Sequence, residues 1–327
     1  MFTEAIEAIL SDHCPSAIVR AIENGAPATH LWRALADNGF LELMAGESVD
    51  GADLGLEAVF PIFVAFGRHA LPVPAAQSIA ARALLRNTPA PAGMITLAGF
   101  ARRKADGSIC ASNVPFGATA DFALVDLEGE LLLLDCAAAE RTGTGVHGSL
   151  AASLCWQKPA VGPRVGDNGA EVPVFSAALH AAAMAGAMER LFEMTLSYCN
   201  DRVQFGKAIG KFQAVQHQLS VMAEHVACAG VAAQLAFATQ AKVPARLAAA
   251  TAKARTSASV PQVAATAHAL HGAIGVTEEF DLQLYSRRLH EWRLADGAES
   301  YWNRIVGESL IGHALPSVLQ FMMEEIL

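Results

Sequence analysis

Apolar side chains recur every three or four residues through about the first 87 positions, which is the spacing of one face of an α-helix. Asn38-Gly39 and the stretch from Gly46 to Gly55 interrupt this pattern. A further helix is expected from Leu56 to Leu71, and another follows Pro72-Val73-Pro74 and runs to Leu85. The positions that define the first helices are Ile6, Ile9, Leu10, Ile18, Ile22, Leu31, Leu35 and Phe40.

Between about residues 93 and 173 the pattern changes to short apolar or alternating runs separated by Gly, Asp and Pro, which is typical of β-strands. The segment from Gly143 to Gly148 has the G-x-G-x-x-G spacing of a dinucleotide-binding loop. Such a loop must directly follow a strand and begin a helix, whereas here a polar segment precedes it and short strands follow, so a loop of the β region is the better interpretation. The expected strands are Gly93–Leu97, Phe122–Leu127, Leu131–Asp135 and Val172–Phe175.

Long helical patterns return from Ser176 onward. Pro261 lies inside the third of these and should kink or divide it, and Gly272 and Gly275 then end that helix and open a turn. The helix lengths and short connections favour an antiparallel four-helix bundle with an added C-terminal helix. The chain is therefore predicted to be mostly α with a small β domain, divided into an N-terminal helical domain (1–90), a middle β domain (91–174) and a C-terminal four-helix bundle (175–327). The expected C-terminal helices span 177–200, 212–240, 245–270, 281–294 and 300–313.

The composition is apolar for a soluble protein, with 53% hydrophobic and 17% charged residues. No stretch reaches about 18 unbroken apolar residues, so no membrane span is expected, and the acidic N-terminus does not resemble a signal peptide. A formal charge of −9 argues against a nucleic-acid surface. Cysteines without a C-x-x-C pair indicate reduced thiols in a cytoplasmic protein; they are Cys14, Cys110, Cys136, Cys155, Cys199 and Cys228.

The most informative stretch runs from Arg202 to Met222 and combines a glycine-containing turn with an amphipathic helix. Gly206 and Gly210 punctuate the turn and allow close approach of the backbone to a ligand. Arg202 and Lys207 beside this turn suit a phosphate or pyrophosphate. The helix has an apolar stripe formed by Phe212, Val215, Leu219, Met222 and Val226, which leaves Gln213, Gln216 and His217 free for polar contacts.

This stretch resembles the flavin-binding signature of the acyl-CoA dehydrogenase family. The resemblance implies that Arg202, Phe205, Gly206 and Gln213 hold the adenine-diphosphate part of an FAD that belongs to a neighbouring subunit. Taken singly, Arg202 also fits a surface ion pair and Phe205 an ordinary core residue. The segment WRALADNGFLELM is similar to the family's N-terminal domain, so the implied architecture is acyl-CoA dehydrogenase-like with a reduced middle β domain.

The segment from His271 to Trp302 resembles the family's glycine turn, the helix after it and its catalytic segment. On this match Asp296 occupies the position of the glutamate that takes the α-proton of a CoA thioester, and Gly272 and Ala273 belong to the flavin-binding glycine turn. Aspartate is shorter by roughly 1.5 Å, a misplacement that can cost on the order of a hundredfold in rate. The family's alternative base position falls at about Ser176, which is not a carboxylate. Replaced flavin contacts are Ala269, Ala273 and Ala298, and the carboxylates that could substitute as base, or simply be solvated, are Glu291 and Glu299.

The departures from the family pattern mainly affect contacts to this subunit's own flavin. The family's Thr-Glu-Pro loop and Trp-containing loop, which pack against the subunit's own flavin, have no match between Gly93 and Val172. Contacts to a neighbour's flavin are partly kept. The resemblance therefore implies one subunit of an FAD-dependent acyl-CoA dehydrogenase that assembles with a more complete partner and passes electrons to electron-transferring flavoprotein. Two alternatives remain, a homomeric enzyme that uses Asp296 and a catalytically inactive structural or regulatory subunit.

The other motifs say less about function. His268 with His271, and His217 with His225, could form helical metal-binding pairs, but no third ligand lies at suitable spacing, and packed histidines are the better interpretation. No local Ser-His-Asp or Cys-His motif is present.

Overall fold

The N-terminal part of the chain is helical, as its apolar spacing predicts. The computed structural model describes residues 2–86, 88–157, 162–313 and 317–326; residues 1, 87, 158–161, 314–316 and 327 of the predicted domain ranges lie outside the described residues. The apolar stripe is buried, since Ile6, Leu10 and Leu35 are fully enclosed. The helices are α1 (Phe2–His13), α2 (Ser16–Glu23), α3 (Thr29–Asp37), α4 (Leu56–Arg68) and α5 (Ala75–Leu85), with short 3₁₀ turns η1 (Phe40–Glu42) and η2 (Glu47–Val49).

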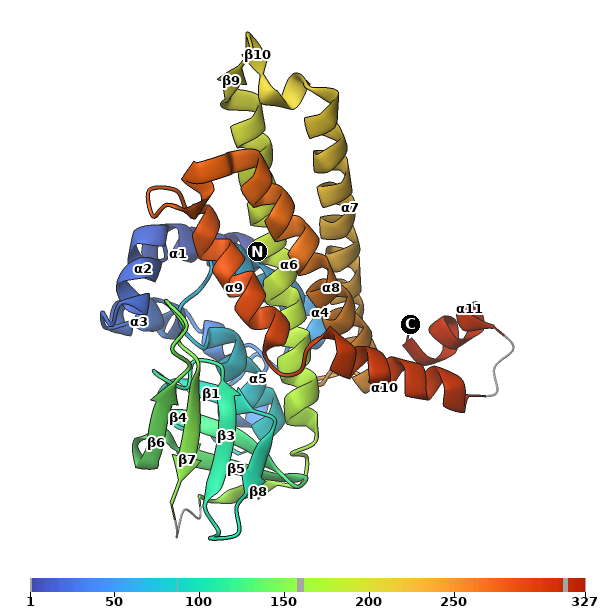
Figure 1. Ribbon diagram of the computed structural model, residues 1–327. Coiled ribbons are helices and arrows are strands. Elements are labelled where there is room, and N and C mark those ends of the chain that lie inside the picture. Colours follow the sequence, from blue (N-terminus) through green and yellow to red (C-terminus); the bar gives the residue numbers. More distant parts are fainter. Residues whose placement is uncertain (1, 87, 158–161, 314–316, 327) are drawn as a thin grey trace.

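The middle of the chain forms two small sheets beside these helices (Figure 1). In the first, β1 (Ile95–Ala98) pairs in parallel with β4 (Phe122–Leu127), which pairs with β5 (Glu130–Asp135), and β5 with β8 (Arg164–Gly166). The second has the antiparallel order β2 (Ala101–Arg103), β3 (Ile109–Val114), β7 (Ala152–Trp156) and β6 (Ala139–Gly143); η3 (Cys136–Ala138) connects β5 to β6. Alternate side chains of the strands form a separate core, which includes Ile109, Val125, Leu134, Leu154 and Trp156.

The prediction of a strand at Val172–Phe175 is wrong, because these residues form the first turns of α6 (Glu171–Asp201). Pro173 fits there, since the first turn of a helix has no intrahelical use for the missing N–H. Val172 and Phe175 are fully buried. A short apolar run does not distinguish a buried strand from a buried helix start, which is why the pattern misled.

The C-terminal half is a helical bundle around α6, which runs from the β sheets to the opposite end of the molecule (Figure 1). Pro261 does not divide α8, which is one continuous helix through Val260 and Val263; both valines are fully buried, so packing compensates for the hydrogen bond that proline lacks. The C-terminal elements are η4 (Ile209–Lys211), α7 (Gln213–Leu235), α8 (Arg246–His271), η5 (Gly272–Val276), α9 (Leu282–Leu294), α10 (Glu299–Gly312), α11 (Val318–Phe321) and η6 (Met322–Ile326).

Helix α6 is long and apolar enough, by length and composition, to cross a membrane. Within the described residues, however, 83% of its most apolar window is buried inside the fold. This burial is what the central helix of a folded core requires, and it accounts for the hydropathy of the segment without a bilayer.

Candidate active site

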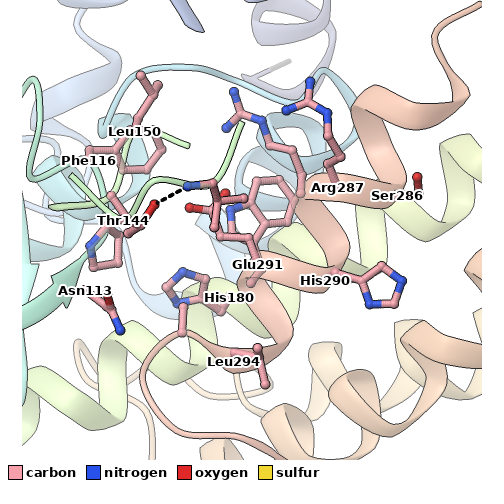
Figure 2. A pocket seen from close by; sticks show the side chains of 16 residues that line it. Asn113, Phe116, Thr144, Leu150, His180, Ser286, Arg287, His290, Glu291 and Leu294 are labelled. Atoms are coloured by element: carbon pink, nitrogen blue, oxygen red, sulfur yellow. Dashed lines mark hydrogen bonds between the residues drawn. The ribbon is translucent and has the colours of Figure 1, made fainter. Parts of the chain in front are cut away.

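A cavity of about 610 Å³ lies between the β sheets and helices α6 and α9 (Figure 2). Its size is in the range that encloses a small-molecule ligand. Apolar side chains form most of its wall, and polar groups project into it from α6, α9 and the loops beside β3 and β7. The residues that line it include Phe116, Leu150, His180, Arg287, Glu291 and Trp292.

An ion pair buried beneath α9 fixes the charged part of this wall. Arg287 Nη2 lies 3.0 Å from Glu23 Oε2, and Arg288 Nε donates to Glu23 Oε1 at 3.1 Å. The Glu23 side chain is 4% exposed, so its charge is neutralised by two guanidinium groups and not by water. On the next turn of α9, Glu291 accepts a hydrogen bond from Ser149 Oγ at 2.5 Å. Glu291 is thus the carboxylate that lines the cavity.

Asp296, at the position expected of the base, faces away from the cavity. Its backbone is left-handed, with φ of 51°, and its carboxylate is 6% exposed. Oδ2 accepts a hydrogen bond from Ser176 Oγ at 2.5 Å and lies 3.1 Å from His180 Nδ1. The neighbouring Ala295 lines the cavity, whereas Asp296 does not. The carboxylate is therefore placed behind the wall, against α6.

His180 connects this buried carboxylate to the cavity. Its ring is 3% exposed and lines the cavity, and Nδ1 also lies 2.9 Å from the backbone oxygen of Ser176. The sequence alone does not point to His180, because a single histidine among alanines on a core helix has no local signal. Its spacing of four residues from Ser176, which places both on one helix face, is the signal that could have raised it.

The turn that carries Asp296 is held from two sides. Lys253 on α8 is fully buried, and its Nζ donates to the carbonyl oxygens of Trp292 at 2.8 Å and Arg293 at 2.9 Å, at the end of α9. Trp302 Nε1 donates to the Asp296 carbonyl oxygen at 2.9 Å. Burial lowers the pKa of Lys253 from 10.5 to about 7. These contacts fix both the end of α9 and the start of α10.

The other candidate base, Glu299, is engaged elsewhere. Both of its carboxylate oxygens accept hydrogen bonds from the Arg293 guanidinium, and these bonds lower its pKa. Glu299 does not line the cavity. Of the two carboxylates considered as substitute bases, only Glu291 lies where it can reach a ligand.

The turn after Arg202 is a two-stranded hairpin, β9 (Val203–Gln204) and β10 (Lys207–Ala208), at the far end of α6 (Figure 1). Phe205 and Gly206 both have positive φ, 52° and 80°, as a tight hairpin turn of this kind requires. Phe205 is 91% exposed, so the alternative that it is a core residue is wrong. The Arg202 side chain is exposed and makes no ion pair within the described residues, which removes the surface ion-pair alternative there as well.

The glycine turn η5 lies on the same side of the bundle as this hairpin. Gly272 has φ of 65° and open space where a side chain would be. Beside it, His271 stacks on Tyr198 with ring centroids 4.4 Å apart, and its Nε2 is buried without a hydrogen-bond partner. An orphaned buried nitrogen next to an open glycine is consistent with a polar ligand at this surface. Ala273 follows in the same turn.

The remaining motifs have structural roles. His268 Nε2 lies 2.8 Å from Ser286 Oγ, and no group of three potential metal ligands occurs among the described residues. Gly143 ends β6, and Gly148 belongs to the loop before β7, with no helix between them, so the glycine motif is a loop of the β region as predicted.

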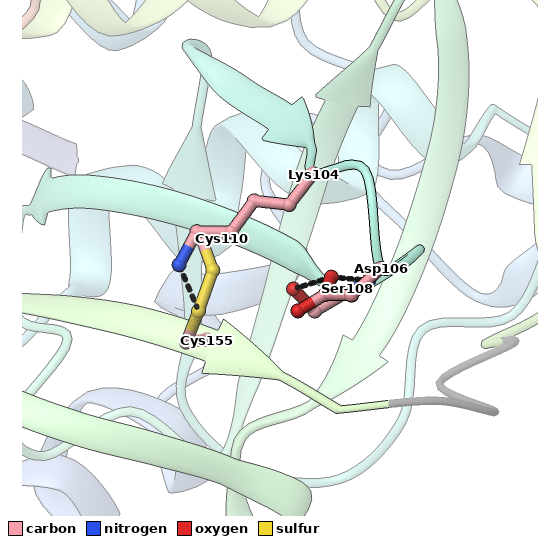
Figure 3. Close-up of a disulfide and its surroundings, with 5 residues drawn as sticks. All are labelled: Lys104, Asp106, Ser108, Cys110 and Cys155. Carbon is pink, nitrogen blue, oxygen red and sulfur yellow. Dashed lines mark hydrogen bonds between the residues drawn. A yellow bond between two sulfur atoms is a disulfide. The ribbon is translucent and has the colours of Figure 1, made fainter.

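The prediction that all cysteines are reduced is wrong for one pair. Cys110 on β3 and Cys155 on β7 form a disulfide (Figure 3). They are register partners on adjacent antiparallel strands although 45 residues separate them, so no local spacing could reveal the pair. Cys14, Cys136 and Cys199 are buried free thiols, and Cys228 is an exposed one.

Comparisons with known proteins agree with the fold described above. A family model for the acyl-CoA dehydrogenase C-terminal domain matches residues 175–311. The acyl-CoA dehydrogenase IpdE2 of Mycobacterium tuberculosis is 31% identical over 297 residues, which cover 89% of this chain and 90% of that protein. The ChsE4–ChsE5 complex from Mycobacterium tuberculosis matches with a TM-score of 0.82 at 23% identity, covering 96% of this chain and 97% of that one. The Tcur3481–Tcur3483 steroid ACAD matches with a TM-score of 0.78 at 24% identity, covering 95% and 96%. These similarities confirm the predicted fold class.

Proposed function

The chain belongs to the acyl-CoA dehydrogenase family, and from this premise we propose that it is one subunit of an FAD-dependent enzyme that oxidises the α–β carbon bond of an acyl-CoA thioester. We further propose that it works in an oligomer with another acyl-CoA dehydrogenase subunit, with electron-transferring flavoprotein as the acceptor. The cavity lined by Phe116, Leu150 and Trp292 would receive the thioester and keep water from it.

The observation that carries the proposal is the separation between the hairpin and the cavity. His180 and Arg202 are 22 positions apart, and both belong to or directly follow the continuous helix α6, so about 33 Å of helix lies between them at 1.5 Å per residue. A ligand whose phosphate binds at the hairpin is therefore not the ligand of this chain's cavity. The rest of that ligand must extend into a neighbouring subunit. A neighbouring subunit's FAD meets this requirement.

The residues at the hairpin fit the adenine-diphosphate end of FAD. Arg202 offers an exposed guanidinium, without an ion-pair partner in the described part of the chain, for pyrophosphate, and Phe205 offers an exposed ring beside Gly206. Gln213 begins α7 as an exposed amide, and Gly272 with Ala273 presents open backbone. When bound, FAD supplies the acceptor for the hydride that leaves the β-carbon. The chain's own residues supply the binding surface for the partner's FAD, and its own cavity, about 33 Å away along α6, would take a thioester for proton transfer alone.

A heteromeric assembly explains the uneven set of flavin contacts. This chain keeps the outward-facing hairpin but has no match to the loops that would pack on its own flavin ring. The structural neighbour ChsE4–ChsE5 is described as a complex of two proteins, which supports a second, different subunit here. The Tcur3481–Tcur3483 neighbour is described as a steroid enzyme, which supports a large, rigid acyl group as the substrate class.

Co-purification tests the proposal. The chain is expressed alone and together with an acyl-CoA dehydrogenase subunit encoded beside it, and the visible spectrum and flavin-to-protein ratio are measured. We expect little flavin with the chain alone and stoichiometric flavin in the assembly. The proposal is wrong if the assembly forms without flavin, or if the flavin-loaded assembly fails to reduce electron-transferring flavoprotein with any acyl-CoA of a broad panel.

A second candidate is an inactive subunit that only completes the partner's flavin site. The inward-facing carboxylate of Asp296 favours it, because this side chain does not line the cavity. Equilibrium binding of acyl-CoA to the assembly separates the candidates. One acyl-CoA per pair of subunits indicates a filled site only in the partner, and two indicate that this chain's cavity is also used.

A further inference from the structure

We propose that His180 is the proton acceptor of this chain's cavity, held in place by Asp296, and that it removes the α-proton of an acyl-CoA thioester. The proposal rests on the proposed function for the identity of the ligand. In this proposal Asp296, in the turn between α9 and α10, positions the base, and the base itself is the imidazole of His180 on α6.

The hydrogen bonds around His180 determine which nitrogen is basic. Nδ1 lies 2.9 Å from the Ser176 backbone oxygen and 3.1 Å from Asp296 Oδ2, and both of these atoms can only accept. Nδ1 therefore carries the hydrogen in the neutral ring. The lone pair is then on Nε2, which makes no hydrogen bond within the described residues, while the ring lines the cavity.

Asp296 meets the requirements of an orienting group. Its carboxylate is 6% exposed, and the Ser176 hydroxyl at 2.5 Å fixes the oxygen that faces the imidazole. A buried carboxylate on Nδ1–H holds the ring in one tautomer and stabilises the imidazolium formed when Nε2 takes a proton. Lys253 and Trp302 lock the turn that carries this carboxylate, so the pair is built into the fold.

Two cavities share the ring of His180 in their walls. His180, Phe116 and Trp292 also line a small apolar recess beyond the main cavity, of about 30 Å³. The recess has room for only about one water molecule, so the acyl group would lie in the main cavity, whose wall includes the ring of His180. Glu291 is the competing base, since it too lines the cavity, but its Oε1 is bonded to Ser149, and among the described residues no second hydrogen bond holds its carboxylate.

The proposed step needs no oxidant. The bond between the α-carbon and its hydrogen breaks, Nε2 forms a bond to that proton, and the electron pair moves into the enolate, whose negative charge lies on the thioester oxygen. Return of a solvent-derived proton regenerates the thioester. The assembled protein should therefore exchange the α-hydrogens of an acyl-CoA for deuterium in D₂O without net turnover.

Exchange is measured by mass spectrometry on the assembled protein with propionyl-CoA and cyclohexylacetyl-CoA, with the partner's own catalytic base inactivated in every sample so that only this chain's cavity can contribute. His180→Asn keeps a donor toward Asp296 but removes the base, and should slow exchange by about 100-fold or more. His225→Asn on α7 is the matched control and should leave the rate unchanged. Asp296→Asn should lower the rate and change its pH profile, because orientation is lost while the imidazole remains.

Nitrogen-15 spectra of labelled histidine give a readout that does not depend on activity. We expect hydrogen on Nδ1 of His180 in the wild type and a shift toward hydrogen on Nε2 in Asp296→Asn. Hydrogen on Nε2 in the wild type would overturn the proposal, as would retained exchange in His180→Asn with exchange lost in Glu291→Gln. Absence of exchange in a flavin-loaded assembly whose partner base is inactivated overturns it while leaving the proposed function intact. Exchange in an assembly that never binds flavin would support the role of His180 and contradict the proposed function.

Discussion

Among single residues, the buried Lys253 has the largest effect on the geometry of the site. Its ammonium group donates to Trp292, Arg293 and Ser257 at 2.8, 2.9 and 3.2 Å, which satisfies all three of its hydrogens. Two of these acceptors are the free carbonyl groups at the end of α9, which every helix leaves without an internal partner. The lysine thus closes the helix that precedes Asp296.

Lys253→Met should destabilise the protein. The substitution keeps a similar length but leaves two buried carbonyl oxygens unpaired, which costs about 1–3 kcal/mol near neutral pH. Urea unfolding at pH 7 measures the change. An unaltered midpoint would show that water or a rearranged turn satisfies the end of α9.

The same lysine predicts a pH dependence of stability. Burial lowers its pKa to about 7 in the folded state, whereas the unfolded chain has 10.5. Between these values the unfolded chain binds the extra proton, so the free energy of unfolding rises with pH across about pH 7 to 10.5. Burial raises the pKa of Cys14 and Cys136 to about 12, so these thiols make the free energy of unfolding fall as pH rises at high pH. This contribution is the same in the wild type and in Lys253→Met. The difference between wild type and Lys253→Met, measured by unfolding at several pH values, isolates the lysine and should grow in favour of the wild type as pH rises.

Arg202→Ala should lower the flavin content of the assembly without affecting the fold. The side chain is exposed and makes no ion pair in the described part of the chain, so its loss removes only a contact to a ligand. A bond between a guanidinium and a pyrophosphate contributes about 1.5–3 kcal/mol, or roughly ten- to a hundredfold in affinity. Flavin affinity is measured by fluorescence titration. Arg103→Ala, an exposed arginine of β2, is the control, and equal affinity in both variants would refute the assignment of Arg202.

At this scale the sequence predicted positions better than orientations. The family pattern led to Asp296 and to Ser176 as the two candidate base positions, and the structure brings both into contact with each other and with His180. The direction of the Asp296 side chain depends on residues more than 100 positions away, which no local pattern contains. The glycines of the sequence predicted a turn around Phe205, and the structure has a hairpin turn there, with positive φ at Phe205 and Gly206.

At the scale of elements, the crossing of α4 and α6 depends on two glycines. A side-chain carbon at Gly186 would lie 2.0 Å from the Val64 carbonyl oxygen, and one at Gly67 would lie 2.1 Å from the Ala183 carbonyl oxygen. Each helix therefore approaches the backbone of the other through a glycine. This contact holds the N-terminal helices against the helix that carries His180.

Gly186→Ala should separate these helices and destabilise the protein by about 3 kcal/mol, at the upper end of the usual cost of overpacking, because a backbone atom and not a flexible side chain blocks the new carbon. Thermal unfolding measures the loss. Gly307→Ala is the matched control within a helix, since nothing lies within 4 Å of its new carbon; it should stabilise by about 0.5–1 kcal/mol. A melting temperature for Gly186→Ala equal to that of the wild type would contradict the close approach.

Long elements were predictable from the sequence, and short ones were not. The expected helix at 212–240 corresponds to α7 (Gln213–Leu235), and the expected strand Phe122–Leu127 is β4. Strands β2, β3, β6 and β8 were not predicted, and β7 only as one of the short strands expected beyond Gly148, because runs with exposed residues such as Ala101–Arg103 give no clear alternating pattern. Their existence depends on pairing with distant strands, as the Cys110–Cys155 register shows.

At the scale of the whole molecule, one apolar surface has no role within the single chain. On α7 the side chains of Ala227, Cys228 and Val231 are exposed, with Val231 70% exposed, on the face opposite the buried Met222 and Val226. The hairpin at the end of α6 exposes two further apolar side chains, Val203 and Phe205. We retain the division into domains 1–90, 91–174 and 175–327 as a hypothesis, in which the last of these forms the oligomer interface.

Val231→Glu tests this interface. A carboxylate placed in an apolar contact between subunits loses hydration without gaining a partner, so the assembly should dissociate while the single chain stays folded. Light scattering of the chain, with and without the partner subunit, should show a loss of mass for the variant, and circular dichroism should show an unchanged helical spectrum. Gln234→Glu, three residues on and also exposed, adds the same charge beside the apolar positions and is the control for charge alone. If the hairpin and α7 act together, the dissociated variant should also lose the flavin that Arg202 helps to hold. An assembly that keeps both its mass and its flavin with glutamate at position 231 would place the interface elsewhere on the chain.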